Sequence, residues 1–321
     1  ETPIAVTASF IRQLVTTNSD YFRPVALGNT NVLVVGDPIY NDDTLQPLPA
    51  AKAEAEWVVK RYDHKAYVVT PLINSTSNEI IDQLYNQEFK IMHFAGHGVY
   101  DIEKDTVGIA IGDGIFVDPA MIKQMGYVPE FVFIICCHSG AVDASDETYY
   151  QNRYKLAANI GTELIDMGVK AIIVTGWAVD DAAAQTFAET FYTHMMQGYD
   201  FGNSVQRARL ATHQNHRETN TWGAYQCYGN PFYKFDSRQG AKEDDYEYVM
   251  ASQVHTDIDN LLSAIRDRRS ASQTILGQLE QYIQKASHAN LLDALVLEKE
   301  ALVYDELGSS FMTMVISPLR R

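Results

Sequence analysis

The strongest constraint on the fold of this chain is a series of short apolar runs, each closed by glycine or a polar turn. Such runs are typical of strands buried on both faces, as the strands of a parallel sheet are. We predict strands of this kind at residues 31–35, 65–69, 90–95, 131–135 and 170–175. Two further runs, 109–111 and 115–117, flank an Asp-Gly pair and predict a hairpin, because Asp-Gly favours tight turns.

Segments with helical composition separate these runs. Thr76 and Glu79 match a capping box, in which the two residues satisfy each other's backbone N–H groups at a helix start. Further helices are predicted at about 50–62, 155–167, 180–197 and 201–213. The alternation of strands and helices predicts an α/β fold: an open, mostly parallel sheet with helices on both faces. Catalytic groups in such sheets lie beyond the carboxyl ends of the strands.

The composition changes at residue 239, where a polar linker begins. Beyond the linker, apolar residues recur at helical spacing from Val249 to Ile265, and helical stretches follow near 271–286 and 289–307. We therefore divide the chain into a lead-in segment (1–30), an α/β domain (31–238) and an all-helical C-terminal region (239–321). The lead-in segment has weak patterning, with a possible helix over residues 4–14. Because the chain begins with Glu1 and not Met, we expect it to be a processed or excised part of a larger protein.

Charge and cysteine content exclude several classes of function. The 321 residues carry a formal net charge of −16, which disfavours direct nucleic-acid binding and an anionic membrane surface, because both need clustered Lys and Arg. The charge permits a cationic partner, although it also promotes solubility. Three cysteines, two of them adjacent at Cys136 and Cys137, cannot form a disulfide framework and indicate a reducing, cytoplasmic compartment. No apolar run reaches the roughly 18 residues that a membrane span needs.

Two predicted strand ends carry residues suited to nucleophilic catalysis. One is residues 93–98 (His-Phe-Ala-Gly-His-Gly), and the other is residues 135–140 (Ile-Cys-Cys-His-Ser-Gly). Since parallel strands end at one edge, we expect His97 and Cys137 to meet there, where an imidazole can take the proton of a thiol nucleophile. Gly98 would leave a backbone N–H open to an oxyanion. The alternative is structural: a packed cysteine and a hydrogen-bonded surface histidine.

The neighbouring residues have plainer interpretations. We expect His93 to be a buried structural histidine, and Cys136 to pack inward, because side chains alternate along a strand. His138 is an alternative base, which we disfavour because adjacent side chains diverge. His213 and His216 could ligate a metal, but no third ligand lies nearby in the sequence. We therefore expect no metal site. The dinucleotide fingerprint and the phosphate loop are both absent, so we expect no nucleotide cofactor either.

Together with residues 36–38 (Gly-Asp-Pro), 48–54, 168–181 and 222–225, these motifs resemble the CHAT family of caspase-like domains, in the clan of caspases, metacaspases and separases. The likeness covers about residues 31–235 in family order. It implies a caspase-like fold and a cysteine endopeptidase that needs no cofactor. His97 would be the general base and Cys137 the nucleophile, and the backbone N–H groups of Gly98 and Cys137 would bind the oxyanion of the tetrahedral intermediate.

The resemblance also suggests where a peptide substrate lies. Thr175, Gly176 and Trp177 match the part of the family that runs along the bound peptide, and we expect them to pair with its backbone as an added strand. Alternatively, Trp177 only covers the sheet end.

The specificity pocket is where this chain departs from a relative. Metacaspases place an Asp two residues before the nucleophile, where this chain has Ile135. Acidic pocket residues would then be Asp143, Asp146, Asp180 or Asp181, or the pocket does not select basic residues. Asp180 and Asp181 could instead cap the following helix. The segment over residues 141–154 is either a mobile activation or substrate loop or a solvated surface loop.

CHAT domains are usually one part of a larger sensor or effector. The resemblance therefore implies cleavage of a specific protein partner, in bacterial (antiviral) defence or programmed cell death, under control of a regulatory partner or of further domains of the same polypeptide. Two alternatives stay open. One is a catalytically silent caspase-like scaffold that binds protein partners, and the other is a small-molecule hydrolase or transferase, which would need a deep closed pocket.

Overall fold

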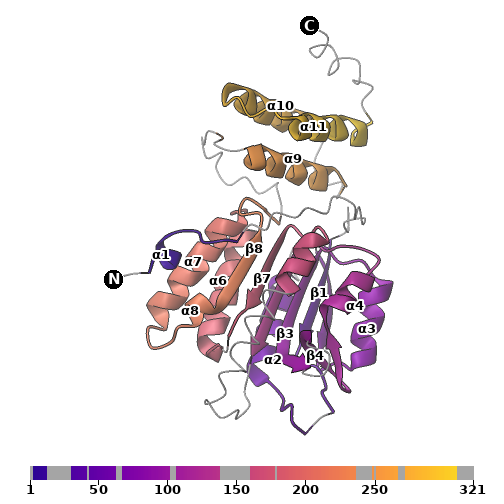
Figure 1. The fold of residues 1–321 in the computed structure, drawn as a ribbon, viewed down its shortest axis with the longest axis vertical. Helices are drawn as coiled ribbons and strands as arrows, with labels where there is room; N and C mark the ends of the chain where they lie inside the picture. The colour runs from indigo at the N-terminus through magenta and orange to yellow at the C-terminus, as the bar shows by residue number, and fades with distance from the viewer. Residues whose placement is uncertain are drawn as a thin grey trace. The chain divides into compact units, whose positions relative to one another are not determined.

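The computed structural model describes residues 3–12, 30–41, 43–62, 67–101, 106–137, 160–177, 179–235, 248, 251–266 and 272–308 (Figure 1). The chain divides into two compact units. Residues 1–26, 30–193 and 202–231 form the first unit, and residues 27–29, 194–201 and 232–321 form the second. Among the described helices, none is both long enough and apolar enough to cross a membrane.

The first unit is built around one sheet. Its strands in the described part of the chain are β1 (Asn31–Gly36), β2 (Val68–Ile73), β3 (Ile91–Asp101), β4 (Thr106–Gly112), β5 (Ile115–Val117), β6 (Phe131–Cys137), β7 (Ala171–Thr175) and β8 (Tyr225–Gly229). The spatial order is β2-β1-β3-β6-β7-β8, with β4 paired to β3 and β5 to β4. The first five strands in that order are parallel, and β8 is antiparallel to β7. The predicted open, mostly parallel α/β sheet is confirmed.

Some element boundaries differ from the prediction. β2 covers Val68–Ile73, so it overlaps the predicted strand at residues 68–69 and extends beyond it, while residues 65 and 66 lie outside the described part of the chain. The extension includes Pro71, which an edge strand tolerates because one of its sides has no partner strand. Among residues 3–12 of the lead-in segment, Ile4–Thr7 (α1) is helical. Arg12 forms an isolated parallel bridge with Tyr228, so described residues of the lead-in segment cover the outer edge of β8.

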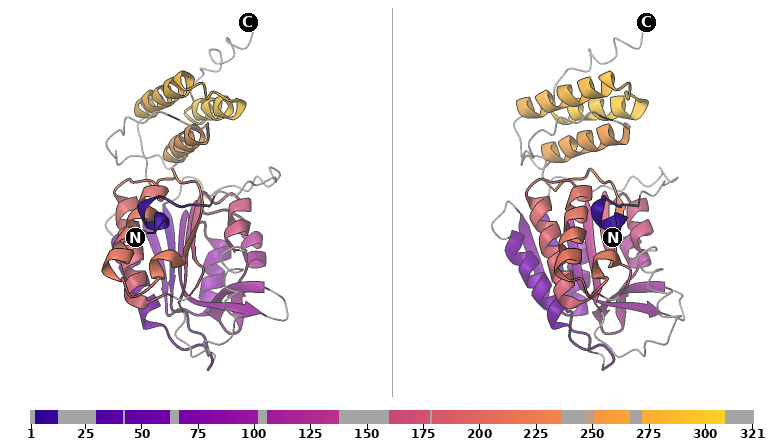
Figure 2. Two further views of the ribbon diagram at one scale, coloured as in Figure 1. Left: turned by 60° about the vertical axis from the view of Figure 1, so that its left-hand side comes forward. Right: turned by 90° about the vertical axis from the view of Figure 1, so that its left-hand side faces the viewer.

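Helices pack on both faces of the sheet (Figure 2). They are α2 (Pro49–Tyr62), α3 (Ser77–Asn86), α4 (Pro119–Gln124), residues 160–166, α6 (Asp181–Met196), α7 (Phe201–Asn215) and α8 (Thr221–Ala224). One face carries a mostly aliphatic core with side chains from α3, α4 and residues 160–166. The other face carries aromatic rings, among which Phe131 stacks on Phe191 of α6 at 5.5 Å. Because alternate side chains of β6 are buried on opposite faces, its sequence is continuously apolar.

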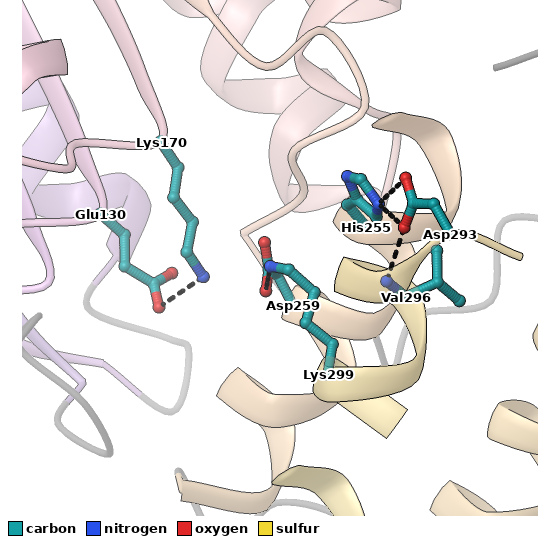
Figure 3. A network of polar contacts seen from close by, with 7 residues as sticks. All are labelled: Glu130, Lys170, His255, Asp259, Asp293, Val296 and Lys299. Atoms are coloured by element: carbon teal, nitrogen blue, oxygen red, sulfur yellow. Dashed lines mark hydrogen bonds and ion pairs between the residues drawn. The ribbon is translucent and has the colours of Figure 1, made fainter. Parts of the chain in front are cut away.

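A buried charge cluster ties the amino ends of three strands together. Lys90, Glu130 and Lys170 directly precede β3, β6 and β7, and the first two are 2% exposed. The Glu130 carboxylate lies 3.2 Å from the Lys170 ammonium (Figure 3) and 3.6 Å from that of Lys90. Burial of a lysine requires such a partner. The cluster therefore holds the amino edge of the sheet.

Three helices of the described residues lie wholly within the second unit: α9 (Ala251–Arg266), α10 (Ser272–His288) and α11 (Ala294–Glu306). They share an apolar core to which α9 contributes Val254, Ile258 and Leu261. Asp293 caps α11 by accepting a hydrogen bond from the Val296 N–H at 2.8 Å, and it also contacts His255 (Figure 3). Lys299 pairs with Asp259. The predicted helical character of this part of the chain is confirmed.

Candidate active site

The sheet brings His97 and Cys137 together in its backbone. β3 and β6 are adjacent and parallel, and their register pairs run from Ile91 with Phe131 to His97 with Cys137. Packing fixes this register, since the His93 ring stacks on the Phe133 ring four residues earlier, with centroids 5.3 Å apart. The two residues named by the sequence therefore occupy neighbouring positions at the carboxyl edge of the sheet.

His97 also marks the point where β3 changes partner. Parallel pairing with β6 ends at His97, and antiparallel pairing with β4 begins at the next residue, where Gly98 faces Ile109. Side chains at such a junction lie where ligands of open α/β sheets bind, outside the carboxyl ends of the strands. Gly98 is half-buried there, and its role toward an oxyanion stays a prediction.

A loop over residues 37–48 covers the His97 ring. The ring is 2% exposed, and the Tyr40 ring packs edge-on against it at 4.8 Å. Gly96 makes room for this contact, because a Cβ at that position would lie 3.1 Å from the Tyr40 hydroxyl. The imidazole is thus held in place from the side opposite the sheet, and it is more deeply buried than a base at an open rim would be.

The same loop decides the tautomer of His97. Nε2 lies 2.7 Å from the backbone carbonyl oxygen of Gln46. A carbonyl oxygen only accepts, so Nε2 carries the hydrogen, and in the neutral ring Nδ1 carries the lone pair. Sequence analysis missed Gln46, because its contact is made by a backbone carbonyl, which has no residue signature. It also missed Tyr40, which contacts His97 through its ring. The only available signal was the Gly-Asp-Pro turn that opens the loop.

Asp37 closes the base of this loop. It is 3% exposed, and its carboxylate accepts a hydrogen bond from the Leu48 N–H at 2.8 Å, across eleven residues. The Asn74 side chain donates to the Asp37 carbonyl oxygen at 3.0 Å and to its carboxylate at 3.3 Å. The two ends of the loop are therefore fixed to one side chain and to the end of β2.

On the α2 and α6 face of the sheet, His93 is fully buried, as predicted. Its Nδ1 lies 3.0 Å from the Tyr192 hydroxyl, and its Nε2 lies 3.4 Å from the Glu54 carboxyl. Burial lowers the pKa of His93 to about 3. Burial, and then the charges of Asp181 and Glu189, raise the pKa of Glu54 well above its ordinary value. His93 and Glu54 thus form a neutral polar contact rather than an ion pair.

The end of β7 and the residue after it already pair on one side with β8 and with the residue before it. Thr175 pairs with Tyr225, and the Gly176 N–H donates to the Ala224 carbonyl at 2.8 Å. On the other side, the register pairs of β7 with β6 end at Val174. Trp177 is half-buried and lies close to Gly223, where a Cβ would come within 3.4 Å of the indole. Pairing of this segment with a substrate strand stays a prediction.

The aspartates proposed for a specificity pocket have different local environments. Asp180 is exposed and caps α6, accepting a hydrogen bond from the Ala183 N–H at 3.0 Å, which is the plainer of its two predicted roles. Asp181 begins α6, and burial followed by the charge of Asp180 raises its pKa. Asp143 and Asp146 lie outside the described residues, and the pocket role of all four aspartates stays a prediction.

Several other predictions also concern unplaced positions. The side chains of Cys136 and Cys137, the alternative base His138 and the segment over residues 141–154 lie outside the part of the chain that the structure describes. His213 packs edge-on against the Trp222 ring, and His216 bonds to the Thr186 hydroxyl at 2.8 Å. Within the described ranges, no three His, Cys, Asp or Glu side chains gather in a way that could hold a metal ion.

Comparison with known proteins gives a family match. The CHAT domain model matches residues 4–230. No curated protein matches the chain. The Arg-specific cysteine proteinase gingipain R has 14% sequence identity and a TM-score of 0.39, over 66% of this chain and 49% of that one. The complex of the Porphyromonas gingivalis RgpB pro- and mature domains has 13% identity and a TM-score of 0.39, over 66% and 50%. The chain thus spans about half the length of these solved chains.

Proposed function

The chain belongs to the CHAT domain family, and on this basis we propose that it is a cysteine endopeptidase in which His97 is the general base and Cys137 the nucleophile. The observation that carries the proposal is the register pair of these two residues at the carboxyl edge of the sheet. The family match covers both strands, which supports a caspase-like peptidase fold for the first unit.

The first chemical step follows from the tautomer of His97. The Gln46 carbonyl holds the hydrogen on Nε2, so Nδ1 is the nitrogen that accepts the thiol proton of Cys137. The thiolate then attacks the peptide carbonyl carbon and forms a C–S bond. The carbonyl oxygen becomes an oxyanion, which the backbone N–H groups of Gly98 and Cys137 stabilise by about 3–4 kcal/mol per donor.

The second step returns the proton. Nδ1–H protonates the leaving amine, the C–N bond breaks, and a thioester to Cys137 is left. A water molecule, whose proton passes to His97, then hydrolyses the thioester and restores the free thiol. This sequence uses only the chain's own residues and water, so the proposal includes no cofactor.

The substrate side of the proposal is an extended peptide. Thr175, Gly176 and Trp177 would pair with its backbone, since the register pairs of β7 with β6 stop just before them. Asp143, Asp180 and Asp181 would form an acidic specificity pocket. The substrate would be a specific protein partner, cleaved in the cytoplasm in antiviral defence or programmed cell death under control of a larger assembly. CHAT membership is what supports this setting.

The proposal is tested by thiol labelling with a peptide-like electrophile, in a Cys136→Ala background that leaves Cys137 and Cys227. Cys227 is the internal control, because it is buried and its pKa is raised to about 11. We expect rapid modification of Cys137, lost on His97→Ala, together with cleavage of a proteome-derived peptide library that Cys137→Ala abolishes. Equal labelling of the two cysteines, with no cleavage, would contradict the proposal.

A second candidate is the catalytically silent scaffold that binds protein partners. The burial of the His97 ring, at 2% exposure, is the observation that favours it, because an enclosed imidazole is less accessible to a substrate than a catalytic base usually is. For the small-molecule alternative, a cavity of about 10 Å³ is present, but apolar side chains such as Leu84, Phe94 and Leu164 line it, and none of the residues named here as candidates does. The scaffold predicts slow labelling of Cys137 that His97→Ala does not change.

A further inference from the structure

We propose that Asp113, at the turn between β4 and β5, is a positioning residue for His97. It acts through the loop over residues 37–48, which it holds where the Gln46 carbonyl can accept the hydrogen bond from His97 Nε2. Asp113 itself touches neither His97 nor the register partner Cys137 in any described contact. The catalytic meaning of this role rests on the proposed function, whereas the structural effect on the imidazole does not.

The β4–β5 turn packs directly on the backbone of the loop. Gly112 has a φ of 106°, and a Cβ there would lie 2.1 Å from the Ile39 carbonyl oxygen, so only glycine allows the approach. One residue later, the Asp113 N–H donates to the Tyr40 carbonyl at 3.0 Å. The turn therefore fixes the backbone of Ile39 and of Tyr40, whose ring covers His97.

The Asp113 side chain joins three elements. Its carboxylate accepts a hydrogen bond from the Asn41 amide of the loop at 2.9 Å. Its other oxygen accepts one from the hydroxyl of Ser77, the first residue of α3, at 2.6 Å. The Ser77 bond and then the Asn41 bond lower the pKa of Asp113, so these contacts favour the carboxylate. An exposed side chain thus links the loop to the hairpin and to a helix of the core.

The loop transmits this link to the imidazole. Asn41 follows Tyr40, whose ring contacts the His97 ring, and Gln46 lies five residues further along the same loop. The Gln46 side chain donates to the Asp43 carbonyl at 2.9 Å, which keeps the second half of the loop folded back. Asp37 fixes both loop ends, and Asp113 fixes its middle. Loss of the middle anchor should free the Gln46 carbonyl before it unfolds the loop.

The β3–β4 pairing gives a reason for this arrangement. β3 carries His97 and then pairs with β4, whose far end is the Gly112–Gly114 turn. The histidine and the anchor of its hydrogen-bond acceptor are therefore carried by consecutive strands of one hairpin. A displacement of this hairpin would move both, so the Nε2 to carbonyl contact is maintained.

The test uses long-range ¹H–¹⁵N spectra of the imidazole rings in the full chain, with His97 assigned by His97→Gln among the nine histidines. In the parent chain we expect the hydrogen of His97 on Nε2. Asp113→Gly and Asn41→Gly remove the contact from either side, and glycine suits the positive φ of both positions. Loss of one net hydrogen bond corresponds to about a fivefold fall in the ratio of the Nε2–H to the Nδ1–H form.

Two variants separate positioning from general stability. Asp113→Asn retains an acceptor for Asn41 and a partner for Ser77, so the ratio should stay within about twofold of the parent value. Asp118→Ala removes a different hydrogen-bonded Asp side chain, which accepts the Met121 N–H at the start of α4, and should also leave the ratio unchanged. An unchanged ratio in Asp113→Gly, or an equal change in Asp118→Ala, would overturn the inference.

The outcome is independent of the proposed peptidase. The spectra report only on the His97 ring, so a chain that cleaves no peptide can still show the predicted tautomer change. Conversely, if the chain is an active peptidase but the His97 tautomer ratio is the same in the parent chain and in Asp113→Gly, only the positioning role is refuted. In an active chain, Asp113→Gly should also lower the rate of Cys137 alkylation near neutral pH by the factor by which the fraction of the Nε2–H form falls, which is smaller than the fall in the ratio.

Discussion

The buried contact between Glu54 and His93 predicts an unusual pH dependence of stability. Between pH 4.5 and 6.5, the ordinary pKa values of Glu and His, the unfolded chain carries one proton on this pair, on the histidine. The folded pair also carries one proton, because burial keeps Glu54 protonated and His93 neutral. Folding therefore takes up no net proton at this site, and the pair contributes no slope to the unfolding free energy.

Substituting either residue alone should make the unfolding free energy depend on pH. In Glu54→Gln, only the unfolded chain binds a proton on His93, so stability falls as the pH falls. In His93→Gln, only the folded chain holds a proton on Glu54, so stability rises as the pH falls. Each slope approaches 1.4 kcal/mol per pH unit, and partial titration of the unfolded groups reduces it to about 1 kcal/mol between pH 6 and pH 5.

Denaturant unfolding at pH 5 and pH 6, at constant ionic strength, measures the effect. Trp57, Trp177 and Trp222 all belong to the first unit, so tryptophan fluorescence reports on the unit that holds the pair. Glu56→Gln makes the same substitution at a half-buried position of α2 outside the Glu54–His93 contact, so it is the matched control and should keep the parent slope.

The reasoning would be refuted by slopes of the same sign in Glu54→Gln and His93→Gln, each taken relative to the parent chain. Parallel slopes in the parent chain and Glu54→Gln would refute it as well. Either result would mean that the folded pair does not hold one proton over this pH range. The loss of stability in each variant at a single pH decides nothing here, because it includes the lost packing.

Three further predictions concern other parts of the molecule. Gly36→Ala should destabilise the first unit by about 1–3 kcal/mol, because the new Cβ would lie 2.3 Å from a side-chain carbon of α2; Gly126→Ala, with nothing within 4 Å, is the control, and tryptophan fluorescence measures both. Burial raises the pKa of Cys227 to about 11 from an ordinary 9.0, so in a variant lacking the other two cysteines it should alkylate at pH 8 about 100-fold more slowly than a free thiol; a rate near the free value would contradict this. Asp293→Ala should cost α11 about 1 kcal/mol, seen as faster amide exchange in that helix. The backbone hydrogen bond at this cap, followed by that from His255, lowers the pKa of Asp293, so its stabilisation is present above pH 3.8 and is lost as the pH falls further; unchanged exchange at pH 7 would argue against the cap.

Much of the fold follows from local pattern. The apolar runs of β1, β3, β6 and β7 and the capping box of α3 identify their elements, because a strand buried on both faces has few polar positions. Boundaries at the sheet edge were less predictable. β2 lies further along the chain than expected, since an exposed edge strand needs neither a continuous apolar run nor every N–H.

The positions of the candidate pair were predictable, and the surroundings of the histidine were not. The carboxyl ends of parallel strands lie at one edge of a sheet, so the sequence could place His97 and Cys137 at that edge, and the register pairs them there. The partners of the histidines were not: Glu54 and Tyr192 meet His93 from two helices far apart in the chain. The cap role of Asp180 was foreseeable, because capping depends on residues only three positions apart.

The residue types and their alternation were therefore enough to determine a parallel α/β sheet, its helical C-terminal neighbour and the pair of candidate catalytic residues. Tertiary structure alone decided which nitrogen of His97 holds the hydrogen, how deeply the ring is buried and which loop holds it there. The physical reason lies in the two deciding contacts. The Gln46 backbone carbonyl contacts the imidazole, and Asp113 contacts the loop at Asn41, 72 residues earlier in the chain. Backbone atoms are alike at every position, so only the folded path of the chain shows which of them meets the imidazole.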